Sequence, residues 1–257
     1  MTQQIIKGTT KLSKKIRSRR LELGLTIEEA ASKAGIGTKT WCRYEAGESM
    51  RKDKAKGVCK ALNWKVIPSD VVEDDSIFNM DEYKNHEAWS EYISECYGEA
   101  AAISFVIGSD IVLDYIEEDL SELERLPKGS HVGQLKSSMI KDILPEQFLM
   151  QYDYEFLYCL KICIMRLRNW ACNSLVAHSV MEELALYLIV EASEFLMETM
   201  FDEMKQYGIE DVDEWNDWLY DVLGDMDIIT WLYSNNYLDC NHTYHFSHWM
   251  EAQFYCE

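Results

Sequence analysis

Proline is nearly absent from this chain, and its scarcity limits what the chain can fold into more than any other feature. The 257 residues include only three prolines, Pro68, Pro127 and Pro145. Proline removes a backbone donor and breaks a helix interior, so long stretches without it can stay helical. Apolar residues recur at helical spacing in these stretches, and no alternating pattern typical of strands competes with that spacing. The sequence therefore predicts an all-α protein.

Charge divides the chain into two parts of opposite sign. The formal net charge is −20, yet residues 1–67 carry 16 Lys and Arg against 6 Asp and Glu, a balance of +10. Residues 68–257 carry 9 basic against 39 acidic side chains, a balance of −30. This asymmetry suggests a module that binds a polyanion, joined to a part that a polyanion repels. We expect a domain at 1–67, an acidic linker at 68–80 and an acidic helical domain at 81–257.

The acidic part is expected to be an α-helical bundle or array. The segment "PKGSHVG" at 127–133 is typical of a loop, and the proline at 145 lies beside an expected helix end. The helices that we expect here cover residues 81–97, 99–126, 134–144, 146–171, 174–207, 212–234 and 243–255.

Two short helices joined by a tight turn are expected in the basic part. The first covers residues 27–34, with Thr26 as a good N-cap and Gly35 as a natural stop. The second runs from residue 37 or 38 to residue 47, which leaves a turn of about three residues at "GIG". A further helix is expected at 52–62.

Three segments carry a resemblance to a known family: "IRSRRLELGLT", "EEAASKAGIG" and "TKTWCRYEAGE". Over residues 13–62 the chain resembles the Cro and phage-repressor type of helix-turn-helix, also called the xenobiotic-response-element family. The resemblance implies a lambda-repressor-like DNA-binding domain in which Arg20 and Glu45 form a buried ion pair linking the first helix to the recognition helix. Trp41 departs from the family pattern, because that position is commonly aliphatic. The core residues that the resemblance implies are Ala34, Ile36, Trp41 and Tyr44.

The expected recognition helix presents Thr38, Lys39 and Arg43 to the major groove, where base edges offer distinguishable donors and acceptors. Lys39 and Arg43 are four residues apart and point the same way, and guanine is the commonest specific target of Lys and Arg. Thr40 is expected to touch a phosphate or a thymine methyl group. The remaining DNA-binding residues that we expect are Thr26, Lys14, Arg17, Arg51 and Lys52.

These features predict a transcriptional regulator, a repressor, that binds double-stranded operator DNA as a homodimer on a palindromic site. The acidic domain would dimerise and sense a protein or a small molecule. A rival hypothesis makes that domain an acidic effector, antitoxin-like or nucleic-acid-mimicking, while the basic part only regulates its own gene. A basic face can also be a solvated surface or a protein-binding module. No phosphate loop, dinucleotide fingerprint or nucleophile motif occurs, so we expect no enzyme and no cofactor.

Cys240 and three histidines near the C-terminus could be drawn as a metal site. His242, His245 and His248 are spaced three apart, and on a helix only two neighbours at that spacing chelate easily. We therefore favour satisfied histidines over a metal site.

Cysteine usage and charge spacing bear on the compartment. The eight cysteines include no CxxC pair and no secretory leader precedes them, which favours reduced thiols in the cytoplasm. The longest run without a charged side chain, 169–181, has 13 residues, fewer than the roughly 20 that a membrane span needs. Six of the eight tryptophans follow residue 67 and suit a core, a partner surface or an aromatic-lined pocket.

Overall fold

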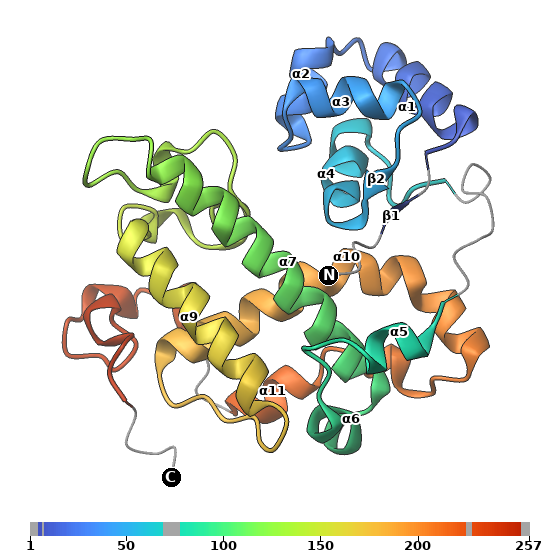
Figure 1. The fold of residues 1–257 in the computed structure, drawn as a ribbon. Helices are drawn as coiled ribbons and strands as arrows, with labels where there is room; N and C mark the ends of the chain where they lie inside the picture. Colours follow the sequence, from blue (N-terminus) through green and yellow to red (C-terminus); the bar gives the residue numbers. More distant parts are fainter. Residues whose placement is uncertain (1–4, 7, 69–77, 225–227, 253–257) are drawn as a thin grey trace. The chain divides into compact units, whose positions relative to one another are not determined.

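The computed structural model divides into two compact units, Met1–Ile77 and Phe78–Glu257 (Figure 1). The described residues are 5–6, 8–68, 78–224 and 228–252. Helices dominate both units. None of the described helices combines the length and the apolar character needed to cross a membrane. Residues 69–77, most of the expected acidic linker at 68–80, lie outside the described residues.

Among its described residues, the first unit has four helices and one pair of short strands. Its elements are β1 (Ile5–Ile6), α1 (Thr10–Glu22), α2 (Ile27–Lys33), α3 (Thr38–Glu45), β2 (Met50–Arg51) and α4 (Lys52–Leu62). Side chains cap the first two helices. The Thr9 hydroxyl accepts from the Leu12 backbone N–H at 3.0 Å. Thr26 and Glu29 exchange hydrogen bonds as a capping box, so α2 begins where the cap predicts.

The two strands were not expected from the sequence. They are antiparallel, with Ile5 opposite Arg51 and Ile6 opposite Met50. Each strand has only 2 residues, too few for an alternating pattern to be visible. The expectation of helices alone is therefore wrong at these positions, where pairing depends on residues far apart in the chain.

Helices α2 and α4 approach closely at Gly57. A Cβ atom built on Gly57 would lie 2.0 Å from the carbonyl oxygen of Ala34, at the end of α2. Glycine weakens a helix interior by about 1 kcal/mol relative to alanine. At this position the close approach of the two backbones explains why glycine is nevertheless used.

Two long helices pack against each other at the centre of the second unit. Its helices are α5 (Met80–Lys84), α6 (Glu91–Tyr97), α7 (Glu99–Leu123), α8 (Met139–Ile143), α9 (Tyr154–Trp170), α10 (Val180–Tyr207), α11 (Trp218–Leu223) and α12 (Ile228–Leu232). The long pair is α7 and α10, and α9 packs against both (Figure 1). At their contact, a Cβ built on Gly108 of α7 would lie 1.9 Å from the carbonyl oxygen of Ile189. This glycine sets how closely the two helices approach.

Several helices of this unit are shorter than expected. The helix expected at 81–97 is interrupted, because the Ser90 hydroxyl accepts from the Ile93 backbone N–H at 2.9 Å and starts a new helix. The helices expected from residues 146 and 174 begin only after the caps Asp153 and Ser179. Capping side chains, more than the apolar period, therefore decide where these helices start.

Three expectations toward the C-terminus are wrong in the same sense. The span 134–144 holds only α8 as an α-helix, and 212–234 holds α11 and α12 as separate short helices. The described part of 243–255 forms turns and a single 3-10 turn. Here the Nδ1 atom of His242 accepts from the Tyr244 backbone N–H at 3.2 Å. A side chain thus takes up a backbone N–H group that would otherwise bond to a carbonyl oxygen within a helix.

Aromatic rings fill the core beside these turns. Phe148 lies 5.4 Å from Trp231 and 5.6 Å from Trp249, measured between ring centroids. Further rings in contact with this group include Tyr152, Phe156, Tyr244 and Phe246. Core packing therefore accounts for much of the aromatic content of the second unit.

We predict that Gly57→Ala destabilises the first unit although alanine is the better helix former. The added methyl group would clash with the Ala34 carbonyl oxygen unless α4 moves away from α2. The control is Ser32→Ala, an exposed site on α2, which should be neutral or slightly stabilising. Hydrogen exchange of α2 and α4 peptides in the full chain measures both. Equal protection in the two variants would contradict the close approach.

Candidate nucleic-acid interface

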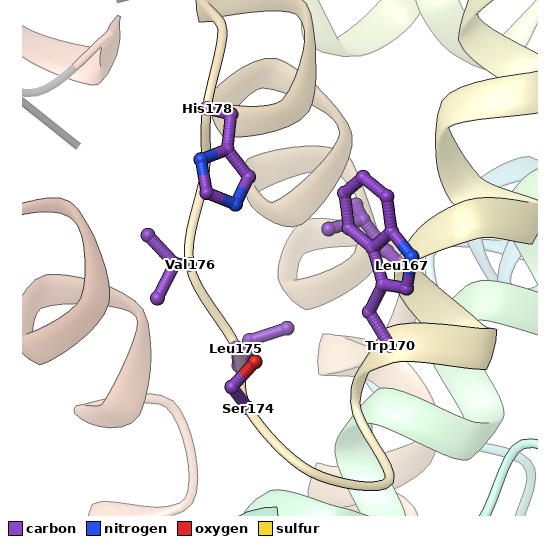
Figure 2. Close-up of a pocket in the computed structure, with 6 residues that line it drawn as sticks. All are labelled: Leu167, Trp170, Ser174, Leu175, Val176 and His178. Carbon is purple, nitrogen blue, oxygen red and sulfur yellow. The ribbon is translucent and has the colours of Figure 1, made fainter. Parts of the chain in front are cut away.

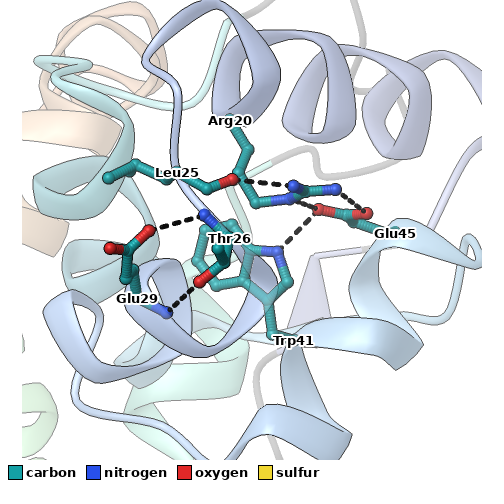
Figure 3. A network of polar contacts seen from close by, with 6 residues as sticks. All are labelled: Arg20, Leu25, Thr26, Glu29, Trp41 and Glu45. Atoms are coloured by element: carbon teal, nitrogen blue, oxygen red, sulfur yellow. Dashed lines mark hydrogen bonds and ion pairs between the residues drawn. The ribbon is translucent and has the colours of Figure 1, made fainter.

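A buried charged cluster joins α1 to α3 (Figure 3). Arg20 donates from Nε to Glu45 Oε1 at 2.5 Å and from Nη2 to Oε2 at 3.1 Å. Its Nη1 atom donates to the Leu25 carbonyl oxygen at 2.9 Å, in the segment before α2. The side chains of Arg20 and Glu45 are only 8% and 9% exposed. One guanidinium thus fixes α1, the α1–α2 connection and α3 relative to one another.

Trp41 is the third member of this cluster. It is fully buried, and its indole Nε1–H donates to Glu45 Oε1 at 2.7 Å. The sequence suggested Trp41 as a core residue and gave no polar role for it. The spacing could have indicated this contact, because residues four apart on a helix are neighbours and Trp41 lies four residues before Glu45. A buried tryptophan generally needs a partner for its N–H, and here the carboxylate provides one.

The cluster perturbs the acid–base behaviour of its members. Burial alone would raise the pKa of Glu45, but the hydrogen bonds from Arg20 and Trp41 and the Arg20 charge outweigh burial and lower that pKa. The hydrogen bond with Glu45 raises the pKa of Arg20 against the effect of burial. Both residues are therefore held in their charged forms.

The turn between α2 and α3 is short and closed by backbone bonds. Gly35 adopts φ of +64°, a left-handed conformation that favours glycine. The Ile36 backbone N–H donates to the Ala31 carbonyl oxygen at 3.0 Å. The turn therefore sets the direction in which α3 leaves α2.

The outer side of α3 carries the residues expected to read bases. Thr38, Lys39 and Arg43 are exposed, and Thr40 is half-buried. Arg43 also engages an acid of its own unit: its Nε and Nη2 atoms each lie 2.7 Å from Glu48 Oε2. These two side chains are 58% and 50% exposed, so another anion can reach the guanidinium. Nothing in the sequence indicated that the Glu48 carboxylate would compete with DNA for Arg43.

The other expected contact residues lie on several elements. Lys14 and Arg17 are exposed on α1, whereas Arg51 and Lys52 are half-buried at the start of α4. Arg51 Nε donates to Asp53 Oδ1 at 3.0 Å. Thr26 is exposed, but its hydroxyl already accepts from the Glu29 backbone N–H at 3.1 Å. The structure therefore brings together Arg20 with Glu45, and Lys39 with Arg43 on one helix, and spreads the rest over the unit.

The histidines near the C-terminus bond to neighbouring protein groups. His248 Nε2 lies 3.0 Å from the Cys240 carbonyl oxygen and its Nδ1 lies 3.2 Å from a Glu251 carboxylate oxygen, contacts that raise the pKa of His248. Within the part of the chain that the structure describes, no three His, Cys, Asp or Glu side chains gather as metal ligands would. The described cysteines are free thiols.

The second unit has a pocket of about 250 Å³ where α9 meets the segment leading to α10 (Figure 2). Polar and apolar groups both contribute to its lining, which consists of Leu167, Trp170, Ser174, Leu175, Val176 and His178. The His178 ring stands edge-on to Trp170, with 5.8 Å between ring centroids. The guanidinium of Arg166 covers Trp170 at 4.7 Å from the ring centroid.

Comparisons with protein-family models, with curated proteins and with solved structures gave no match.

We predict that the cluster loses its stabilising effect in acid. Because the pKa of Glu45 lies below its ordinary value of 4.5, the contribution is complete above pH 4.5 and is lost as pH falls through the lower folded-state value. At neutral pH, Glu45→Ala should cost about 3 kcal/mol, because it leaves Arg20 buried without its partner. The free energies of unfolding of wild type and variant are compared by following the NMR signal of the Trp41 indole N–H during denaturant titration. A difference that stays constant from pH 7 to pH 3 would contradict this assignment.

Proposed function

We propose that this chain is a DNA-binding transcriptional regulator, a repressor whose first unit works as a helix-turn-helix. In this proposal α3 lies in the major groove, and Lys39 and Arg43 contact base edges. The observation that carries it is the arrangement of α3: on its buried side Glu45 binds Trp41 of the same helix and Arg20 of α1, while its other side stays exposed. A helix held rigidly in this way can present side chains to DNA at a reproducible depth.

Charge supports the same proposal. The basic part of the chain has a balance of +10, which favours phosphate contacts that depend little on sequence. The remainder, at −30, is repelled by the same phosphates. Local charge would therefore direct the first unit to DNA and keep the second away, and repression would follow from occupancy of the operator.

The half-site read by one such unit is only a few base pairs long. Two copies related by a two-fold axis read two half-sites, so we propose a homodimer on a palindromic operator. The second unit would supply the dimer contact and could take up a regulating small molecule or protein.

A second candidate function is an acidic effector that binds a basic partner protein, while the first unit only regulates its own gene. The −30 balance favours this candidate, since it is complementary to a strongly basic surface.

We predict that full-length protein selects a palindromic consensus from random DNA. The double variant Lys39→Ala/Arg43→Ala should lose that consensus, because each base contact contributes about 1–3 kcal/mol to discrimination. The control Lys136→Ala removes a basic charge from an exposed position in the second unit and should select the wild-type consensus. Binding that ignores sequence in all three proteins would favour the effector over the regulator.

We also predict that Glu48→Gln strengthens DNA binding by about two- to fivefold. Glu48 competes for the Arg43 guanidinium, and an exposed ion pair is worth at most about 1 kcal/mol, which limits the gain. The matched control is Glu22→Gln, since Glu22 forms an exposed pair with Arg19 on α1 at 3.1 Å. Fluorescence anisotropy with the selected operator compares the variants at one salt concentration. A larger gain for Glu22→Gln would show that Arg43 does not read the site.

A further inference from the structure

Helix α9 exposes a row of large apolar side chains. Tyr154, Tyr158, Ile162 and Met165 are each exposed, Ile162 by 37% and Tyr158 by 51%. At 3.6 residues per turn, these positions fall within about 80° of arc on one side of the helix. We call this row the α9 stripe. A continuous row of this kind is more typical of a contact surface than of scattered exposed residues.

The α9 stripe lies on a nearly neutral surface of a strongly acidic unit. Along α9, which the structure describes throughout, the exposed charged side chains are Glu155 and Arg166, one of each sign. The half-buried cations on its flank are compensated by acids of neighbouring segments: Lys161 by Glu117 at 2.9 Å, and Arg168 by Asp110 at 3.0 Å and Glu87 at 3.3 Å. Two copies of a unit with a balance of −30 repel each other over most of their surface, and this face largely avoids that repulsion.

The order of residues along the stripe fits a second copy running in the opposite direction. The midpoint in sequence between Tyr154 and Met165 lies about half a residue from Leu160. The midpoint between Tyr158 and Ile162 is Leu160 itself. Two antiparallel helices that cross at this point would therefore place Tyr158 of each copy against Ile162 of the other. Tyr154 of each copy would then lie against Met165 of the other.

The charges flanking the stripe obey the same symmetry. Glu155 and Arg166 share one edge of the α9 stripe and are also centred about half a residue from Leu160. In an antiparallel two-fold pair, equivalent edges adjoin, so Glu155 of each copy faces Arg166 of the other. Arg166 already pairs with the buried Glu182 but remains 47% exposed, so its guanidinium can bind a second carboxylate.

Further exposed apolar side chains lie near both ends of α9. Met150, which precedes α9, is 74% exposed, and Trp170 and Val176 border the pocket at the other end. Met150 and Trp170 are again centred near Leu160. A second copy would thus bring its Met150 toward the aromatic edge of this pocket (Figure 2), a contact favourable for a thioether.

We propose that the α9 stripe is an isologous dimer interface, which a second copy of this chain covers in antiparallel orientation. The inference rests on the proposed function only for the role of the dimer, which is to bind operator DNA. It names the surface that holds two first units together on a palindromic operator.

Sedimentation velocity of the full-length chain without DNA tests the proposal. We expect a dimer at micromolar concentration, and at least about tenfold weaker association for Ile162→Asp, because the variant buries an unpaired charge at the centre of the interface. The control is Leu238→Asp, at an exposed apolar site outside α9, which should leave the dimer intact. A wild-type monomer, or Ile162→Asp dimers as tight as wild type, would overturn the proposal.

A charge exchange tests the antiparallel register. Glu155→Arg alone places two arginines opposite each other twice and should weaken the dimer, whereas mixing it with Arg166→Glu should restore association as a heterodimer. If loss of the Glu182 partner unfolds Arg166→Glu, the salt dependence of Glu155→Arg decides instead. Added salt screens the overall repulsion between the acidic units in both proteins. In wild type it also screens the attraction between Glu155 and Arg166, whereas in the variant it screens a repulsion between arginines, so salt should strengthen association of the variant more than that of wild type. A larger salt-induced gain for wild type, or no heterodimer from two folded variants, would overturn the register.

These results are separable from those of the DNA selection. If the chain is a dimer that selects no DNA sequence, the α9 interface stands and the proposed regulator is wrong. If the chain is a monomer that still selects a single half-site, the α9 interface is wrong and the DNA-binding proposal stands.

Discussion

The first unit depends on a single buried carboxylate. Glu45 accepts from the indole of Trp41 on its own helix and from the guanidinium of Arg20, and the bond to Arg20 ties α3 to α1 through two side chains that are only 8% and 9% exposed. Removing two opposite charges from water is costly, and this cost is offset only when hydrogen bonds satisfy the remaining donors and acceptors. The Leu25 carbonyl oxygen and the indole supply such bonds. The position of the exposed residues on α3 is a consequence of this arrangement on its inner side.

The distribution of charge gives the two units different relations to other molecules. A basic unit joined in one chain to a strongly acidic one can be attracted locally to a polyanion even though the net charge of the whole chain is repelled by it. The same acidic balance discourages contact between copies, so a nearly neutral apolar face becomes a favoured place for self-association. On α9 the exposed charges and the apolar stripe lie on one helix, and both follow the residue order that the proposed antiparallel pairing requires.

Close helix packing in both units is set by glycine. Gly57 lets α4 approach the end of α2, and Gly108 lets α7 approach α10, each against a backbone carbonyl oxygen. A glycine inside a helix weakens that helix when it is considered alone. The benefit comes from atoms of another helix, which local propensity does not register. This is why these positions were not recognised from the sequence.

The sequence by itself determined that the chain is helical, where its charge changes sign, and which short segment pairs a capped helix with a glycine turn. Those properties depend on composition, period and neighbouring residues. The resemblance suggested that Arg20 and Glu45 pair, but only the tertiary structure placed the Trp41 indole on the same carboxylate and Glu48 on Arg43. It also decided that Ser90, Asp153 and Ser179 begin new helices, and that residues 243–252 form turns around an aromatic core. A carboxylate, a cap or a ring has several partners within reach along the chain, and the packing of distant segments selects among them.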